Sequence, residues 1–166
     1  MRMTNLGIRV LLDELEMIDV EGKNVCILGI DNWMGVDRLQ NWHHYEERIN
    51  RIKTRFRTVP SNCLTLALAH TPDIIQKLDG LKINVMFSGH THGGQIRLPF
   101  LGPLFSWSSF QRKYNRGLYK YNGAYLYVNA GVGTDSFLSV RLFCPPEISL
   151  IKICGSRSGK KHKFSA

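Results

Sequence analysis

The chain has 166 residues, of which 43% are hydrophobic and 21% are charged. These proportions are ordinary for a soluble globular protein, and they exclude a disordered or fibrous chain. Lys and Arg number 22 against 13 Asp and Glu, which gives a formal net charge of +9. An excess of this size favours an anionic partner, such as a phosphate-bearing substrate, a nucleic acid or an acidic membrane surface.

The two ends and the cysteines indicate the compartment. The first residues lack the apolar core of a signal peptide, and no apolar stretch approaches the roughly 20 residues that span a bilayer. The four cysteines are far apart and form no Cys-x-x-Cys pair, so we expect reduced thiols and a cytosolic setting. Residues 155–166 carry four basic residues and no acid, which predicts a disordered tail or a contact with anionic lipid headgroups.

The N-terminal third combines predicted strands with one helix. Short apolar or alternating runs at 10–12, 15–20 and 25–30 are typical of strands, and residues 21–24 are typical of a turn. Between 43 and 59, apolar residues recur at steps of four and three, which predicts an amphipathic helix that ends before Pro60.

The middle of the chain predicts a strand–helix–strand unit. The apolar runs 63–69 and 83–88 are typical of strands covered on both faces. Thr71 as N-cap, Pro72 at the first helical position and Gly80 at the end predict a short helix between them. Further on, residues 98–114 predict a long structured loop, and Asn-Gly at 122–123 predicts a hairpin over 119–128. Residues 140–143 and 148–153 are expected to be the last strands.

Three histidines are the candidate functional residues. His70 ends the first strand of the unit, whereas His90 and His92 lie in a glycine-flanked loop just after the second. Strand ends of this kind meet at the mouth of an α/β sheet, and neutral imidazole is a common metal ligand. The residues alone leave three alternatives open: unrelated core histidines, a mononuclear three-histidine zinc site, and a basic module that binds membrane or nucleic acid without catalysis. No recognised nucleic-acid motif supports the last with nucleic acid.

The histidine motif resembles a known family. Gly-His-Thr-His-Gly-Gly-Gln at 89–95, with His70 upstream, resembles the Gly-His-x-His signature of the calcineurin-like metallophosphoesterases. Ala-His-Thr-Pro-Asp at 69–73 and Ile-Arg-Leu-Pro at 96–99 resemble one bacterial branch of that family, which includes UDP-2,3-diacylglucosamine pyrophosphatases of lipid A synthesis. The resemblance continues through Pro-Glu-Ile at 146–148 and covers nearly the whole chain.

The resemblance implies a fold and a reaction. Residues 1–154 would be the C-terminal half of a four-layer αββα metallophosphoesterase domain with mixed sheets and flanking helices. The family is a metal-dependent hydrolase of phosphoric esters and anhydrides, and it uses two divalent ions (Mn, Zn, Fe or Mg). His70 and His90 would bind one ion and His92 the other, so that a metal-bridged hydroxide attacks a phosphodiester or pyrophosphate. UDP-2,3-diacylglucosamine would be a candidate substrate, and the cytoplasmic face of the inner membrane a candidate location.

The same resemblance implies that residues outside this sequence complete the site. The family motifs Asp-x-His, Gly-Asp and Gly-Asn-His-Asp do not occur here. They would supply the bridging Asp, an Asn ligand and the catalytic acid–base histidine, so this chain alone is expected to expose apolar sheet edges and to be unstable or inactive. Gln95, Arg97 and Arg141 are candidate substrate-binding residues; Arg141 would either hold a phosphate by its guanidinium fork or form a structural ion pair. The apolar loop 99–107 is expected either to fold back over the core or to contact acyl chains or a bilayer.

Overall fold

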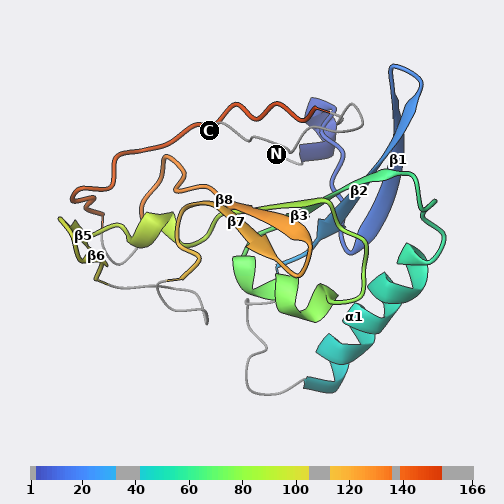
Figure 1. The fold of residues 1–166 in the computed structure, drawn as a ribbon, viewed down its shortest axis with the longest axis horizontal. Helices are drawn as coiled ribbons and strands as arrows, with labels where there is room; N and C mark the ends of the chain where they lie inside the picture. The colour runs from blue at the N-terminus through green and yellow to red at the C-terminus, as the bar shows by residue number, and fades with distance from the viewer. Residues whose placement is uncertain (1–2, 33–41, 105–112, 136–138, 155–166) are drawn as a thin grey trace.

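A computed structural model of the protein describes residues 3–32, 42–104, 113–135 and 139–154 (Figure 1). The tail 155–166 and the end of the apolar loop, residues 105–107, lie outside these ranges. The helical elements are the 3₁₀ helices η1 (Met3–Leu6), η2 (Pro72–Leu78) and η3 (His92–Gly94) and the α-helix α1 (Trp42–Phe56). The strands are β1 (Glu14–Val20), β2 (Lys23–Ile30), β3 (Leu64–Ala69), β4 (Val85–Ser88), β5 (Arg97–Leu98), β6 (Gly102–Pro103), β7 (Gly117–Tyr121) and β8 (Ala124–Val128).

One mixed sheet organises the molecule. Its six strands have the order β1-β2-β3-β4-β8-β7, and β5 pairs separately with β6. The four inner strands β2, β3, β4 and β8 are parallel. At the two outer positions, β1 pairs antiparallel with β2 and β7 pairs antiparallel with β8. The predicted mixed α/β fold and the parallel strand–helix–strand unit are therefore confirmed. All four parallel strands end at the same edge of the sheet, which is where their following loops meet.

The predicted hairpin is also confirmed, and its turn has the expected geometry. Asn122 and Gly123 have φ values of 43° and 87°, as a two-residue type I′ turn requires. Tyr121 faces Ala124 in the register, and the pairing runs on to Gly117 opposite Val128.

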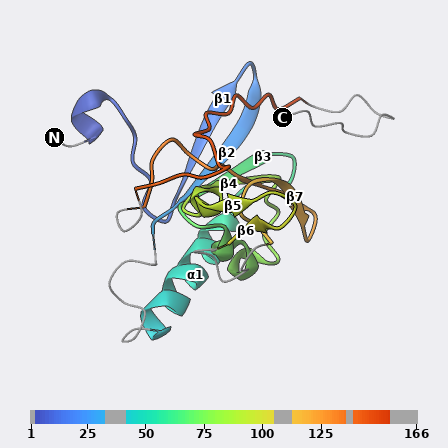
Figure 2. The same cartoon turned by 90° about the vertical axis from the view of Figure 1, so that its left-hand side faces the viewer.

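The core lies between the sheet and the two helical elements on one of its faces. Helix α1 turns Ile49, Ile52 and Phe56 inward, as the apolar period predicts, and each is buried. Both ribbon views place α1 and η2 on one side of the sheet and the C-terminal segment on the other (Figures 1 and 2). The cluster also contains Leu28, Ile30, Ala67, Ile74, Ile75, Leu78, Ile83, Met86, Tyr114, Ala124, Leu126 and Val128.

An ion-pair cluster fixes α1 to the start of the sheet. Arg48 Nε lies 2.6 Å from Asp13 Oδ2, and Arg48 Nη2 lies 3.5 Å from Asp31 Oδ2. Both side chains of the closer pair are largely buried, with 22% of Arg48 and 19% of Asp13 exposed. Because Asp13 precedes β1 and Asp31 follows β2, the cluster joins the helix to both strands.

Several predicted elements differ in the structure. Residues 10–12 and 148–153 form no strand, and residues 140–143 contribute only an isolated parallel bridge between Ile96 and Leu142. The segment 148–153 alternates as a strand would, but it has no neighbouring strand to pair with among the described residues, and Ile148 and Leu150 are 90% and 100% exposed. The helix after Thr71 is a 3₁₀ helix rather than an α-helix, and the Thr71 side chain makes no capping hydrogen bond.

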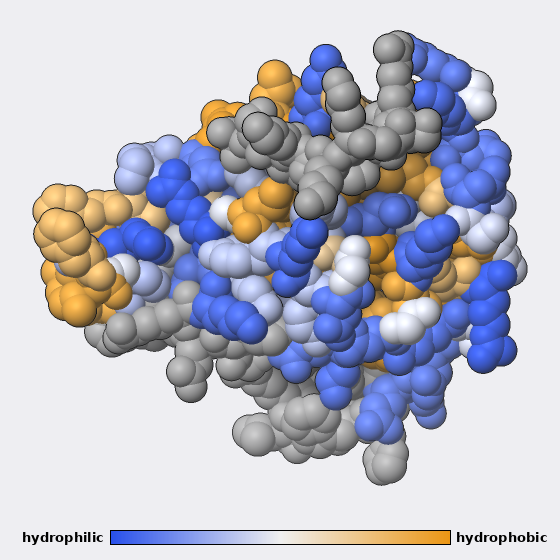
Figure 3. Space-filling view, in the orientation of Figure 1, coloured by the Kyte–Doolittle hydropathy of each residue, from blue (hydrophilic) through white to orange (hydrophobic). Residues whose placement is uncertain are grey.

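Apolar side chains remain exposed on the far face of the sheet and at one end of the molecule. A depression of about 420 Å³ lies between β4, β7, β8 and residues 147–153. The β5–β6 turn carries Phe100 and Leu101, which are 107% and 69% exposed, so this part of the apolar loop does not fold over the core. Apolar surface is visible at the β5–β6 end of the space-filling view (Figure 3). No helix among the described residues is both long and apolar enough to cross a bilayer.

Candidate metal centre

His70 and His90 meet at the carboxyl edge of the parallel strands. His70 directly follows β3, and His90 lies two residues after β4. Gly89 N donates to His70 O at 3.1 Å, which joins the two loops at the point where they leave the sheet. The two imidazole rings consequently lie with their centroids 4.6 Å apart and their planes inclined by 55°. The structure thus brings together two of the three histidines that the sequence singled out.

His92 belongs to a tight turn that begins at Thr91. Thr91 Oγ1 donates to Asn115 O at 2.6 Å and accepts from Gly93 N at 3.4 Å. His90 and His92 have positive φ values of 67° and 47°, a conformation that costs a residue with a side chain about 1–3 kcal/mol. Strain of this kind persists only where surrounding contacts hold it, and it is concentrated at functional sites.

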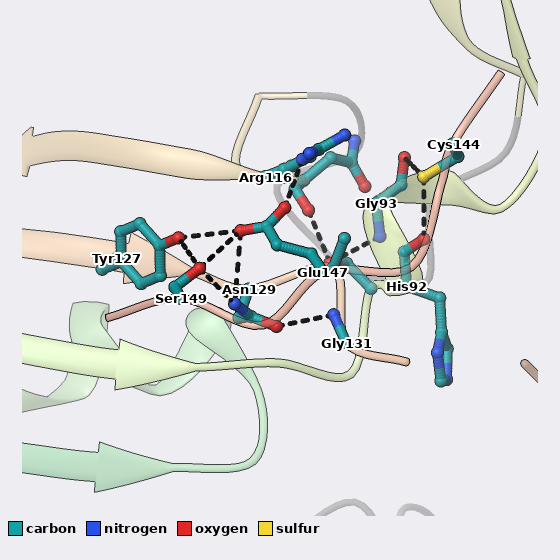
Figure 4. Close-up of polar contacts among 12 residues, drawn as sticks. His92, Gly93, Arg116, Tyr127, Asn129, Gly131, Cys144, Glu147 and Ser149 are labelled. Atoms are coloured by element: carbon teal, nitrogen blue, oxygen red, sulfur yellow. Dashed lines mark hydrogen bonds and ion pairs between the residues drawn. The ribbon is translucent and has the colours of Figure 1, made fainter. Parts of the chain in front are cut away.

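Close packing beneath this turn requires a glycine at position 93. Gly93 has φ 63°, and a Cβ added there would lie 2.7 Å from Cys144 Sγ and 3.1 Å from the Cβ of Ala130. Cys144 Sγ also donates to His92 O at 3.4 Å. The turn therefore rests directly on the segment that contains the buried Cys144, while the His92 imidazole points away from that contact (Figure 4).

The environment of His70 favours the form of imidazole that binds a metal. Partial burial, followed by the charge of His92, lowers the pKa of His70 below its ordinary value. The ring is therefore neutral at neutral pH, with a lone pair available for coordination. A depression of about 510 Å³ adjoins the ring and is lined in part by Arg9, Ser88, Gly89 and Asn129. Arg9 belongs to no recognisable motif, so the sequence offered no reason to select it.

The donors present fit part of a metal-ligand set. Two adjacent imidazoles suit zinc, iron and related ions. Within the described ranges, however, no three His, Cys, Asp or Glu side chains are grouped so that they could hold a metal ion. A dinuclear site needs carboxylates that bridge the ions and offset their charge.

The three candidate substrate-binding residues surround the His92 turn and bond to backbone. Gln95 is 2% exposed, and its Oε1 accepts from Asp135 N. Arg97 Nη1 donates to Gly93 O at 2.9 Å. The Arg141 guanidinium donates to backbone carbonyls, among them His92 O at 3.3 Å. These contacts with backbone hold the turn in place. Contacts of the three residues with substrate stay predictions.

A polar cluster around Glu147, which sequence reasoning did not identify, supports the same region (Figure 4). Glu147 Oε1 accepts from Tyr127 Oη at 2.8 Å, from Ser149 Oγ at 2.9 Å and from Asn129 Nδ2 at 3.2 Å, and Glu147 Oε2 lies 2.5 Å from Arg116 Nε. Burial acts to raise the pKa of Glu147, but the hydrogen bonds and the arginine outweigh it and hold the pKa below its ordinary value. The family resemblance included residues 127–133 and 146–148 but assigned no role to this cluster.

Comparison with known proteins identifies the family. The chain is 34% identical over 133 residues to the uncharacterised metallophosphoesterase YkuE of Bacillus subtilis, an alignment that covers 80% of this chain and 42% of YkuE. It is 34% identical over 93 residues to the phosphodiesterase YaeI of Escherichia coli, which covers 56% of this chain and 33% of YaeI. It is 36% identical over 97 residues to the UDP-2,3-diacylglucosamine pyrophosphatase LpxG of Chlamydia trachomatis, which covers 52% of this chain and 28% of LpxG. The chain belongs to the calcineurin-like metallophosphoesterase family.

This metallophosphoesterase chain spans less than half the length of these relatives. No family model matches it, and no solved structure matches it. The family implies divalent metal cofactors, and the relatives' names indicate hydrolysis of phosphate esters or pyrophosphates. The imidazoles of His70 and His90 lie together at the sheet edge where the sequence leads us to expect such a site.

Proposed function

We propose that this chain contributes the histidine ligands of a dinuclear metal site in a hydrolase that cleaves a phosphodiester or a pyrophosphate. The approach of the His70 and His90 rings, 4.6 Å between centroids beside a depression of about 510 Å³, carries the proposal. His70 and His90 would hold one ion, and His92 would hold the second. When bound, such ions polarise the phosphoryl oxygens and activate water for in-line attack.

The carboxylates and the acid–base histidine come, in this proposal, from polypeptide beyond residues 1–166. The absence of Asp-x-His, Gly-Asp and Gly-Asn-His-Asp from the sequence and the partial match to longer relatives support this view. The apolar far face of β3 and β4, where Leu68 is 45% exposed, offers a surface against which a second layer of that protein would pack.

The substrate we propose is lipid-linked, of the UDP-2,3-diacylglucosamine type. One named relative, LpxG, is a pyrophosphatase for that compound. The exposed Phe100 and Leu101 suit acyl chains or the surface of a bilayer, and Arg97 ties their hairpin to the His92 turn through Gly93 O. The net charge of +9 suits both a phosphate and an anionic membrane surface.

Metal binding and turnover together test the proposal. We expect the purified chain to bind Zn²⁺ or Mn²⁺ in isothermal titration calorimetry, and His70→Ala and His90→Ala each to abolish that binding. His162→Ala, in the basic tail, is the matched control and should leave it unchanged. Hydrolysis of bis(p-nitrophenyl) phosphate should appear only when the chain is fused to the part of YkuE that the alignment does not cover, and it should require His90.

Two results would contradict the proposal. Hydrolysis by the 166-residue chain alone would show that its own residues complete the site. Metal binding that survives loss of both His70 and His90 would place the ligands elsewhere.

A further inference from the structure

The guanidinium of Arg141 lies at the meeting point of three backbone segments. Nη1 donates to His92 O and to Cys144 O, both at 3.3 Å. Nη2 donates to Ala130 O at 2.7 Å and to Gly131 O at 3.1 Å. Nε donates to Gly133 O at 2.9 Å, and Nη2 also contacts that oxygen. One side chain therefore bonds to carbonyls of the His92 turn, of the loop after β8 and of the Cys144 segment.

Each of these acceptors is a neutral carbonyl oxygen, so the arrangement satisfies polar backbone without neutralising a carboxylate. Hydrogen bonds from a charged donor are about twice as strong as neutral ones, and a planar guanidinium offers five donors in a fixed fork. Lysine has a single ammonium with three donors and cannot match this arrangement of acceptors. The site is built for arginine in particular.

The contact with His92 O gives this network a role at the metal centre. His92 has a strained φ of 47°, and holding its carbonyl fixes the peptide plane that follows its Cα. Cys144 Sγ donates to the same oxygen, and Gly93 is packed against Cys144 and Ala130. The contacts of Arg141 and Cys144 with the His92 carbonyl therefore fix the backbone from which the imidazole projects.

We infer that Arg141 is a positioning residue for His92: its guanidinium holds the turn in the strained conformation that directs the imidazole toward the metal site. The part of this inference that concerns the metal rests on the proposed function, whereas the part that concerns the turn does not. Loss of an outer partner that orients a ligand typically lowers metal affinity about 10–100-fold. Arg141 thus acts through His92 rather than on substrate.

Hydrogen exchange measured by mass spectrometry tests the effect on the turn. Arg141→Lys keeps the charge but loses the fork, and we expect faster amide exchange in peptides covering residues 89–97 and 129–133, with unchanged exchange in β2 and β3. Arg48→Lys is the matched control, since Arg48 is also a partly buried arginine but joins α1 to Asp13 rather than to the His92 turn. That variant should leave exchange in 89–97 unchanged.

Competition with a chromophoric chelator for Zn²⁺ tests the effect on the metal. Measured on the fusion with the remainder of YkuE, Arg141→Lys should lower the affinity for the second Zn²⁺, the ion proposed for His92, by about 10-fold or more, and Arg48→Lys should leave it unchanged. Equal exchange in 89–97 for Arg141→Lys and the unsubstituted chain overturns the inference. So does an affinity for the second Zn²⁺ that Arg141→Lys leaves unchanged. If the unsubstituted fusion binds no second Zn²⁺, the proposed function fails, and the exchange result still decides whether Arg141 holds the turn.

Discussion

Replacing Gly93 by alanine is expected to destabilise the protein by about 2–5 kcal/mol. The left-handed conformation at φ 63° accounts for about 1–2 kcal/mol of this cost. The new Cβ would also lie 2.7 Å from Cys144 Sγ and 3.1 Å from the Cβ of Ala130, and crowding of a packed interior costs about 1–3 kcal/mol more. Both neighbours are buried, at 1% exposure each, so neither can move aside into solvent.

Gly131→Ala separates the two contributions. Gly131 has φ 66°, almost the value at Gly93, but a Cβ added there would have no heavy atom within 4 Å. This control should therefore lose only about 1–2 kcal/mol. The double variant Gly93→Ala with Cys144→Ala removes the 2.7 Å contact and should lose less than the sum of the two single variants.

Equilibrium urea unfolding followed by far-UV circular dichroism measures these differences through the midpoint, provided that the slope is unchanged. The reasoning is refuted if Gly93→Ala destabilises the chain no more than Gly131→Ala does. It is also refuted if the losses in the double variant simply add, because the contact with Cys144 would then contribute nothing.

Two further substitutions probe the support of the site and the core. Because Glu147 has a pKa below its unfolded value of 4.5, its stabilising effect is complete above that pH and disappears as the pH falls through the lower folded value. The free energy of unfolding of Glu147→Gln should therefore fall less than that of the unsubstituted chain between neutral pH and about pH 3, and urea midpoints at several pH values check this; parallel curves would contradict it. Ile52→Ala, at a residue 1% exposed on the inner face of α1, should cost about 2–5 kcal/mol in the same assay, whereas Arg51→Ala at the neighbouring exposed position should change stability by less than about 0.5 kcal/mol.

Local sequence signals predicted those elements whose cause is local. The Asn122-Gly123 turn, the inner face of α1 and the parallel pair β3–β4 follow from turn chemistry and apolar period. The segment 148–153 shows the limit of such signals, because alternation makes a strand possible but only a neighbouring strand supplies the pairing. The sequence shows the alternation, but the described structure has no strand paired with this segment.

The candidate site was also predictable from the sequence only in part. The meeting of His70 and His90 could be anticipated, since both follow parallel strands that end at one edge. The fixation of His92 could not, because it depends on Arg141 and Cys144, which are distant in sequence and reach the turn only in the folded chain. Arg141 was expected either to hold a phosphate or to form a structural ion pair, and the described contacts of its guanidinium are instead with backbone carbonyls and, at 3.7 Å, with Cys144 Sγ. Whether it also contacts substrate stays a prediction.

Because β2, β3, β4 and β8 are parallel, all their carboxyl ends lie at one edge of the sheet and all their amino ends at the other. The residues that follow the strands, His70 and His90 among them, lie at one edge, and the Asn122-Gly123 turn closes β7 and β8 at the other. We therefore expect adaptation to a new substrate to change the loops of one edge, while the turn at the opposite edge is constrained by chain reversal and by the 2.9 Å hydrogen bond from Asn122 Nδ2 to Asp79 Oδ1. Sequence divergence among homologues should therefore be greater in the loops after the carboxyl ends of the parallel strands than at their amino ends.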